Sequence, residues 1–154
     1  TLMRSSAASD VYKRQVKYAE QFGVIFAIEP VWKHIVYTVE RARKVLDAID
    51  SPNLQIIFDP VNLLCVDNID KQDEIIEKAF ELLGDDIAVV HCKDYVVEGN
   101  ELKSIAAGTG SLNYPLLLKK VKEYKPYVHC TLENTVPENA VATREFMERT
   151  YAEV

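Results

Sequence analysis

Short apolar runs alternate with amphipathic stretches along most of the chain. Four runs rich in β-branched and aromatic residues predict strands, at residues 24–29, 54–59, 87–91 and 128–133. Apolar residues at helical spacing predict a helix after each run, at residues 38–49, 71–83, 115–124 and 138–151. Asp70 is a predicted N-cap, Gly84 a helix stop, and Pro115 suits a first helical turn. Residues 16–22 resemble the end of an earlier helix, and residues 96–113 a long loop.

Strands that alternate with helices indicate an α/β fold with a parallel sheet, because each parallel connection needs a crossover. A doubly wound sheet would usually carry a G-x-G-x-x-G turn, and none follows any predicted strand. A (β/α)8 TIM barrel instead places functional side chains at the carboxyl ends of several strands. The barrel is favoured because every predicted strand ends in Glu, Asp or His. Since a complete barrel has about 250 residues, we expect the C-terminal half, strands five to eight.

Residues 5–15 differ in character from the rest of the chain. Their sequence, SSAASDVYKRQ, matches a reading frame through the adapter used in transposase-based DNA library preparation. Segments of this kind are set aside before fold reasoning, and residues 1–4 are suspect with them. We therefore expect residues 1–15 to be a non-native, disordered tail. Residues 16–154 are then a partial barrel domain whose N-terminal part is missing.

Composition narrows the class of protein. Apolar residues make up 48% of the chain and charged residues 27%, which is typical of a globular protein and excludes a disordered one. No apolar run approaches the ~20 residues of a membrane span, and a net charge of −6 argues against a nucleic-acid surface. Three cysteines, an odd number, favour a reducing, cytoplasmic location. These observations leave open whether the protein forms a homo-oligomer.

Four strand-end residues, Glu29, Asp59, His91 and Glu133, are predicted to point into the barrel mouth, since the alternate positions carry apolar side chains. Any one of them could be a loop cap or an ion-pair partner, but together they would repel without a cation. Their donor atoms suit Mn²⁺ or Mg²⁺, with Co²⁺ as a further choice and Zn²⁺ less suitable. Such an ion could polarise an α-hydroxy carbonyl compound and stabilise an enediolate, while a carboxylate moves the proton.

Five short motifs resemble the sugar phosphate isomerase/epimerase family with the xylose isomerase-like barrel. They lie within residues 16–154 and read EP at 29–30, DPVN at 59–62, HCKD at 91–94, GTGSLNY at 108–114 and EN at 133–134. The resemblance implies one divalent ion on the Glu-Asp-His-Glu set and a sugar or sugar-phosphate substrate. It also implies that Glu29 and Glu133 exchange the proton on opposite faces of a ketose. Members include ketose 3-epimerases, hydroxypyruvate isomerases and inosose dehydratases.

The chain departs from the family pattern at Asn62, where many members have a substrate-contacting histidine. An amide still hydrogen-bonds a hydroxyl, but it cannot act as a cation or an acid. The DNA-repair endonuclease relatives use a three-zinc cluster that needs more histidines than the three present here.

Three further residues are candidates for substrate binding beside Asn62. Lys93 shares a face with His91 and could stabilise an oxyanion or phosphate, or simply be solvated. His34 could line the mouth or lie on the surface, and Trp32 could stack on a sugar or pack on the rim. The predicted function is a divalent-metal isomerase or epimerase of a sugar or sugar phosphate. The alternatives are a polyol dehydratase on the same metal site and a non-catalytic sugar-binding barrel.

Overall fold

A computed structural model describes the backbone of residues 2–154 and the side chains of residues 10–154. The strands are β1 (Phe26–Ile28), β2 (Leu54–Phe58), β3 (Ile87–Glu98), β4 (Glu101–Ala106) and β5 (His129–Leu132). The α-helices are α1 (Leu2–Phe22), α2 (Val39–Ile49), α3 (Gln72–Leu83), α4 (Tyr114–Tyr124) and α5 (Ala140–Glu153). In the described part of the chain, no helix combines the length and apolarity that crossing a membrane requires.

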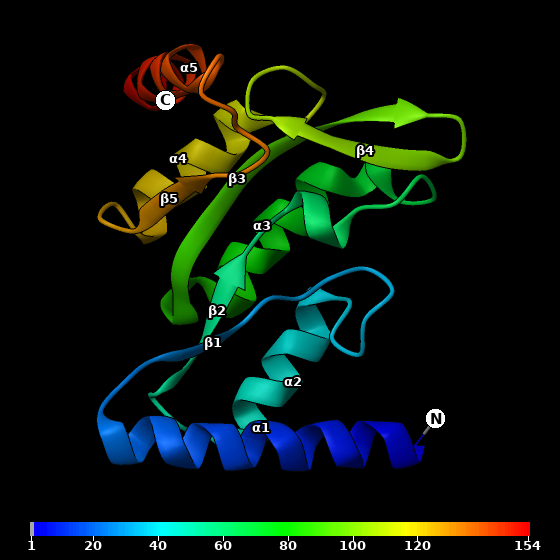
Figure 1. Cartoon of the computed structure of the whole chain (residues 1–154), viewed down its shortest axis with the longest axis vertical. Coiled ribbons are helices and arrows are strands. Elements are labelled where there is room, and N and C mark those ends of the chain that lie inside the picture. The colour runs from blue at the N-terminus through cyan, green and yellow to red at the C-terminus, as the bar shows by residue number, and fades with distance from the viewer. Residues whose placement is uncertain (1) are drawn as a thin grey trace.

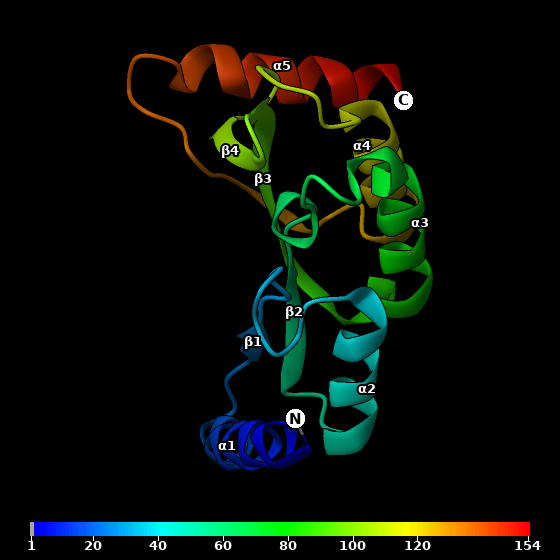
Figure 2. The same ribbon diagram turned by 90° about the vertical axis from the view of Figure 1, so that its right-hand side faces the viewer.

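Strands β1, β2, β3 and β5 form a parallel sheet, with β1 and β5 at its two edges. Helices α2, α3 and α4 cover one face of this sheet, while α1 and α5 lie across its opposite ends (Figures 1 and 2). In Figure 2 no described helix lies over the other face. Parallel strands joined by helices on a single face are the arrangement of a partial (β/α)8 barrel, so the predicted fold class is confirmed.

The hydrophobic core lies between the sheet and its helix layer. Ile56 and Phe58 of β2 and Val90 of β3 are fully buried, and the Phe58 ring meets Phe80 of α3 edge-on, with 5.4 Å between ring centroids. The opposite, barrel-facing side is more open, since Ile57 and Val89 are only partly buried. Burial of apolar area on the helix side therefore holds the layers together.

Two predicted helices begin at side-chain caps. The Thr38 hydroxyl accepts from the Arg41 N–H at 3.3 Å at the start of α2, and the Asn113 side chain accepts from the Leu116 N–H at 3.2 Å at the start of α4. The prediction of Asp70 as the cap of α3 is wrong. Asp70 lies inside a 3₁₀ turn (Ile69–Lys71) that precedes the helix, and the capping position has no side-chain hydrogen bond.

Residues 96–113 are not the long loop that we predicted. Strand β3 continues to Glu98, and β4 returns antiparallel to it, with Lys93 opposite Ala106 and Val97 opposite Leu102. The tip is a Gly-Asn pair, with Gly99 at φ +62°, and such a pair between alternating residues favours a two-residue hairpin turn. Local turn chemistry thus decided the structure of this segment.

The N-terminal region is helical, contrary to the disorder predicted for residues 1–15. Helix α1 is anchored by Val16 and Ala19, which are buried, and by Tyr12, whose ring lies 6.4 Å from that of Phe26. These contacts account for the predicted helix end at residues 16–22. The preceding Lys, Arg and Gln are good helix formers, so the helix continues toward the N-terminus. Thr1 lies outside the described residues.

Candidate metal centre

The four predicted ligands meet at the carboxyl ends of the parallel strands. Glu29 follows β1, Asp59 follows β2, His91 lies within β3 and Glu133 follows β5. One ligand atom from each of these residues lies within 4.8 Å of all the others. Two local features place them: prolines directly after Glu29 and Asp59 help to end those strands, and the β3–β5 register sets His91 opposite Thr131, two residues before Glu133.

Direct contacts tie the cluster together. His91 Nδ1 lies 3.0 Å from Glu29 Oε1 and 2.7 Å from Glu133 Oε1. The Asn62 side-chain amide donates to Glu29 Oε1 at 3.1 Å, and its backbone N–H donates to Asp59 Oδ1 at 3.2 Å. Asn62, which the sequence marked as a substrate-binding candidate, therefore orients two of the carboxylates.

Lys93 lies inside the cluster as its counter-ion. Its side chain is 8% exposed, and Nζ lies 2.7 Å from Asp59 Oδ2 and 2.9 Å from Glu133 Oε2. Burial raises the pKa of the Asp59 carboxyl to about 6, even though Lys93 opposes the shift. Burial acts to lower the pKa of the Lys93 ammonium, but the carboxylates of Asp59 and Glu133 outweigh it and raise that pKa. The sequence indicated the shared face of Lys93 and His91, but not this ion pair.

The donor set fits a divalent cation. Three carboxylates and one ammonium leave two formal negative charges when His91 is neutral. The side chain of Asp59 is fully buried, and among the described residues its Oδ2 has no partner in hydrogen-bonding geometry, although Lys93 Nζ is close. The Lys93 ammonium balances the charge of this oxygen, so the feature that a further cation would offset is the remaining excess of two negative charges. Oxygen donors with one imidazole suit a hard divalent ion.

The two other substrate-binding candidates occupy the loop after β1. The Trp32 N–H donates to the Asn62 carbonyl at 2.6 Å, and the residue as a whole is 37% exposed. A hydrogen bond to the Asn62 backbone thus links Trp32 to the residue that orients Glu29. His34 is exposed and lines a separate shallow depression with Tyr12, Lys33 and Ile35. The structure therefore does not bring His34 to the four ligands.

The buried carboxylate of Asp94, to which the sequence analysis gave no role, fixes the backbone in the middle of β3. Asp94 is 1% exposed and accepts backbone N–H groups from Gly108, Gly110 and Leu112 at distances of 2.8–3.1 Å. The Tyr114 hydroxyl donates to the Lys93 carbonyl at 2.9 Å. These bonds hold the backbone at Lys93, beside the cluster. In the sequence, only the Gly108-Thr109-Gly110 segment indicated a turn that could accompany such a role.

The profile of the xylose isomerase-like TIM barrel family matches residues 7–150. The chain belongs to this family. This match confirms the predicted family resemblance. A search of curated proteins gave no significant match.

Solved structures share the fold of this xylose isomerase-like chain. A D-tagatose 3-epimerase-like protein is 24% identical over 97% of this chain and 55% of its own, with a TM-score of 0.79. The IOLI protein with a bound zinc atom is 20% identical over 97% and 54%, with a TM-score of 0.67. A probable 3-DHS dehydratase from Bacillus anthracis is 15% identical over 92% and 55%, with a TM-score of 0.68. The chain thus spans about half the length of these structures.

Proposed function

We propose that this chain supplies the metal-binding half of a divalent-metal-dependent isomerase or epimerase of a small sugar or sugar phosphate. One observation carries the proposal: three carboxylates and an imidazole from four successive parallel strands converge within 4.8 Å, with an excess of two negative charges. Membership of the xylose isomerase-like family and the fold shared with an epimerase-like protein support it.

Glu29, Asp59, His91 and Glu133 would hold the ion. When bound, a divalent metal supplies Lewis-acid polarisation of a substrate carbonyl. The oxygen-rich donor set favours Mn²⁺ or Mg²⁺. The zinc atom bound to a protein of the same fold supports a divalent ion without deciding which one.

Glu29 and Glu133 are the proposed catalytic residues. They come from the two edge strands and flank His91, so they can face a substrate from opposite sides. One glutamate, as a carboxylate, removes the proton next to the substrate carbonyl and becomes a carboxylic acid, giving an enediolate. The other glutamate, which starts as a carboxylic acid, gives its proton to the opposite face and becomes a carboxylate. Lys93 orients Glu133, and Asn62 orients Glu29. Trp32 and His34 stay candidates for substrate contact beyond the reacting carbons.

A polyol dehydratase is the second candidate function. The dehydratase that shares this fold favours it, because the same cluster could also assist loss of a hydroxyl group. A sugar-binding barrel without turnover is the non-enzymatic alternative. The two enzymes differ in product: a dehydratase releases water and forms a new carbonyl compound, whereas an epimerase conserves composition.

Solvent exchange in the full-length protein tests the proposal. We expect Mn²⁺-loaded protein to catalyse exchange of a ketose C–H proton with deuterium from D₂O, followed by NMR. Glu133→Gln should lower the exchange rate about 100-fold or more, as expected for loss of a general base. Glu98→Gln, which changes an exposed acid on the β3–β4 hairpin, is the matched control and should behave as the parent. Exchange unaffected by Glu133→Gln would remove Glu133 from the mechanism.

A further inference from the structure

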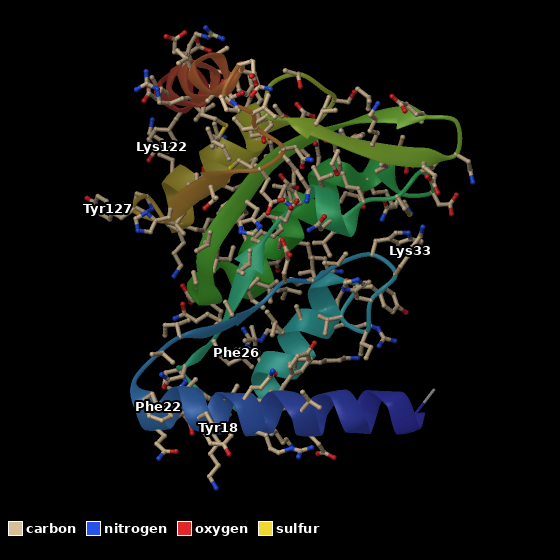
Figure 3. All side chains as sticks on the ribbon, viewed as in Figure 1. Tyr18, Phe22, Phe26, Lys33, Lys122 and Tyr127 are labelled. Atoms are coloured by element: carbon tan, nitrogen blue, oxygen red, sulfur yellow. The ribbon has the colours of Figure 1, made fainter. Side chains whose placement is uncertain are left out.

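A hollow of about 440 Å³ lies between three loops at the carboxyl ends of the strands. It is bounded by the loop after β1 (Trp32 and Lys33), the segment after β2 (residues 64–67) and the hairpin tip (residues 100–102). None of the four cluster ligands lines it. Figure 3 shows Lys33 on the side of the molecule to which the β3–β4 hairpin reaches. The volume falls in the range of small-molecule sites, roughly 300–1,000 Å³.

Two hydrogen bonds connect the lining of the hollow to the four-ligand cluster. Trp32 donates its backbone N–H to the Asn62 carbonyl at 2.6 Å, and the Asn62 side chain donates to Glu29 at 3.1 Å. Leu64 and Cys65, which also line the hollow, follow Asn62 in the chain. A substrate whose carbonyl end lies at the cluster could therefore extend its other end toward the hollow.

The side chains that line the hollow match hydroxyl groups better than phosphate. Asp67 and Glu101 offer carboxylate oxygens that accept hydroxyl protons, and Asn100 can both donate and accept. The partly exposed Trp32 ring offers an apolar face to C–H groups. Lys33 is the one cationic side chain among the lining residues that the structure describes, so the lining carries an excess of one negative charge.

We propose that this hollow binds the distal, hydroxyl-bearing end of an uncharged ketose and discriminates against sugar phosphates. The inference rests on the proposed function, because it places the reacting carbonyl at the cluster. Phosphate recognition in proteins relies on Arg or Lys donors. Here Lys33 shares the lining of the hollow with two carboxylates, and Lys93 is already paired with Asp59 and Glu133. A phosphate group in the hollow would meet a lining with a net negative charge, in which two carboxylates outnumber the single ammonium of Lys33.

Trp32 supplies a direct readout, because it is the only tryptophan in the chain. Its emission in the full-length protein is isolated by subtracting that of a Trp32→Phe variant. The probes are D-fructose, D-tagatose, D-psicose and D-sorbose, and the 6-phosphates of the first two. Each is titrated into Mn²⁺-loaded and into metal-free protein. We expect uncharged ketoses to change Trp32 emission and the phosphates to bind about tenfold more weakly or worse, because of like-charge repulsion.

Charge reversal separates the hollow from the protein's general field. Glu101→Lys should reduce the preference for the uncharged sugar about tenfold, since it converts the lining from an acidic to a basic excess. Glu98→Lys makes the same charge change on the same hairpin, outside the hollow, and should leave the preference unchanged. Tighter binding of a phosphate to the parent, or a silent Trp32 with all six probes, would overturn the proposal. Equal effects of the two lysine variants would also overturn it.

The outcomes also separate this inference from the proposed function. Solvent exchange of the ketose proton with no response from Trp32 would leave the isomerase proposal intact and remove the hollow from substrate binding. Binding reported by Trp32 without any metal-dependent exchange would keep the hollow as a sugar-binding site and remove the isomerase proposal.

Discussion

Lys93→Met tests whether a cation is needed inside the four-ligand cluster. Methionine keeps an unbranched side chain of similar length but removes the charge. The Asp59 side chain is fully buried and that of Lys93 is 8% exposed, so the variant leaves a buried carboxylate without its counter-ion. Removing one partner of a buried pair costs about 3–5 kcal/mol. We therefore expect the metal-free full-length protein to lose unfolding free energy of that size.

A divalent ion should offset most of this loss. Bound by Asp59 and its neighbours, it would supply the positive charge that Lys93 provides in its absence. Mn²⁺ should therefore stabilise the Lys93→Met protein more than it stabilises the parent. Urea unfolding of both proteins, in EDTA and at saturating Mn²⁺, measures the two differences directly.

Lys103→Met is the matched control. Lys103 pairs with Glu98 at 2.9 Å on the hairpin, but both side chains are about 60% exposed. An exposed pair of this kind contributes roughly 0–1 kcal/mol, and Mn²⁺ should not change its contribution. If Lys93→Met costs no more than Lys103→Met in EDTA, the buried ion pair is refuted. If its cost is the same with and without Mn²⁺, a metal ion does not take over the role of Lys93.

Three further predictions concern the frame around the site. Asp94→Asn should cost about 2–4 kcal/mol of unfolding free energy in chemical denaturation, because hydrogen bonds to a buried charge are each worth about 1.5–3 kcal/mol. Asp73→Asn, at an exposed acid, should stay within about 0.5 kcal/mol, and equal losses would contradict the assigned role of Asp94. Gly110→Ala places a Cβ in steric conflict with the Tyr95 carbonyl oxygen and should cost about 1–3 kcal/mol or more in thermal unfolding. Gly99→Ala is the control, because a Cβ there meets nothing within 4 Å; it should cost only about 1–2 kcal/mol, from the positive φ of Gly99. A larger loss of stability for Gly99→Ala than for Gly110→Ala would refute the packing argument. Residues 1–154 expressed alone should self-associate in analytical ultracentrifugation. The reason is that β1 and β5 each leave an unpaired sheet edge and that Ile25 is 52% exposed. An active monomer would contradict this prediction.

The strands and the convergence of the four candidate ligands could be predicted from the sequence because both depend on local pattern. Each apolar run ends in Glu29, Asp59, His91 or Glu133, and alternation within a strand fixes which face each side chain takes. The parallel sheet then brings strand ends together without any knowledge of long-range contacts. The prediction of Pro115 in the first turn of α4 likewise followed from short-range chemistry.

Other features depend on contacts that a single sequence does not reveal. The pairing of Lys93 with Asp59 and Glu133 joins three strands. The hydrogen bonds that Asp94 accepts from the turn at residues 108–112 span a hairpin. The hairpin itself had a local signal in Gly99-Asn100, which the loop interpretation gave too little weight. Helix α1 extends beyond its predicted start because Lys13, Arg14 and Gln15 favour a helix and because Tyr12 packs near Phe26, a contact that only the tertiary structure supplies.

Anomalous diffraction from crystals of the full-length protein grown with Mn²⁺ tests the central claim most directly. The account predicts a single ion peak in contact with one atom from each of Glu29, Asp59, His91 and Glu133, at about 2.0–2.6 Å. An ion bound elsewhere, or one that two or more of these four residues fail to contact, would contradict the metal site and the chemistry proposed for it.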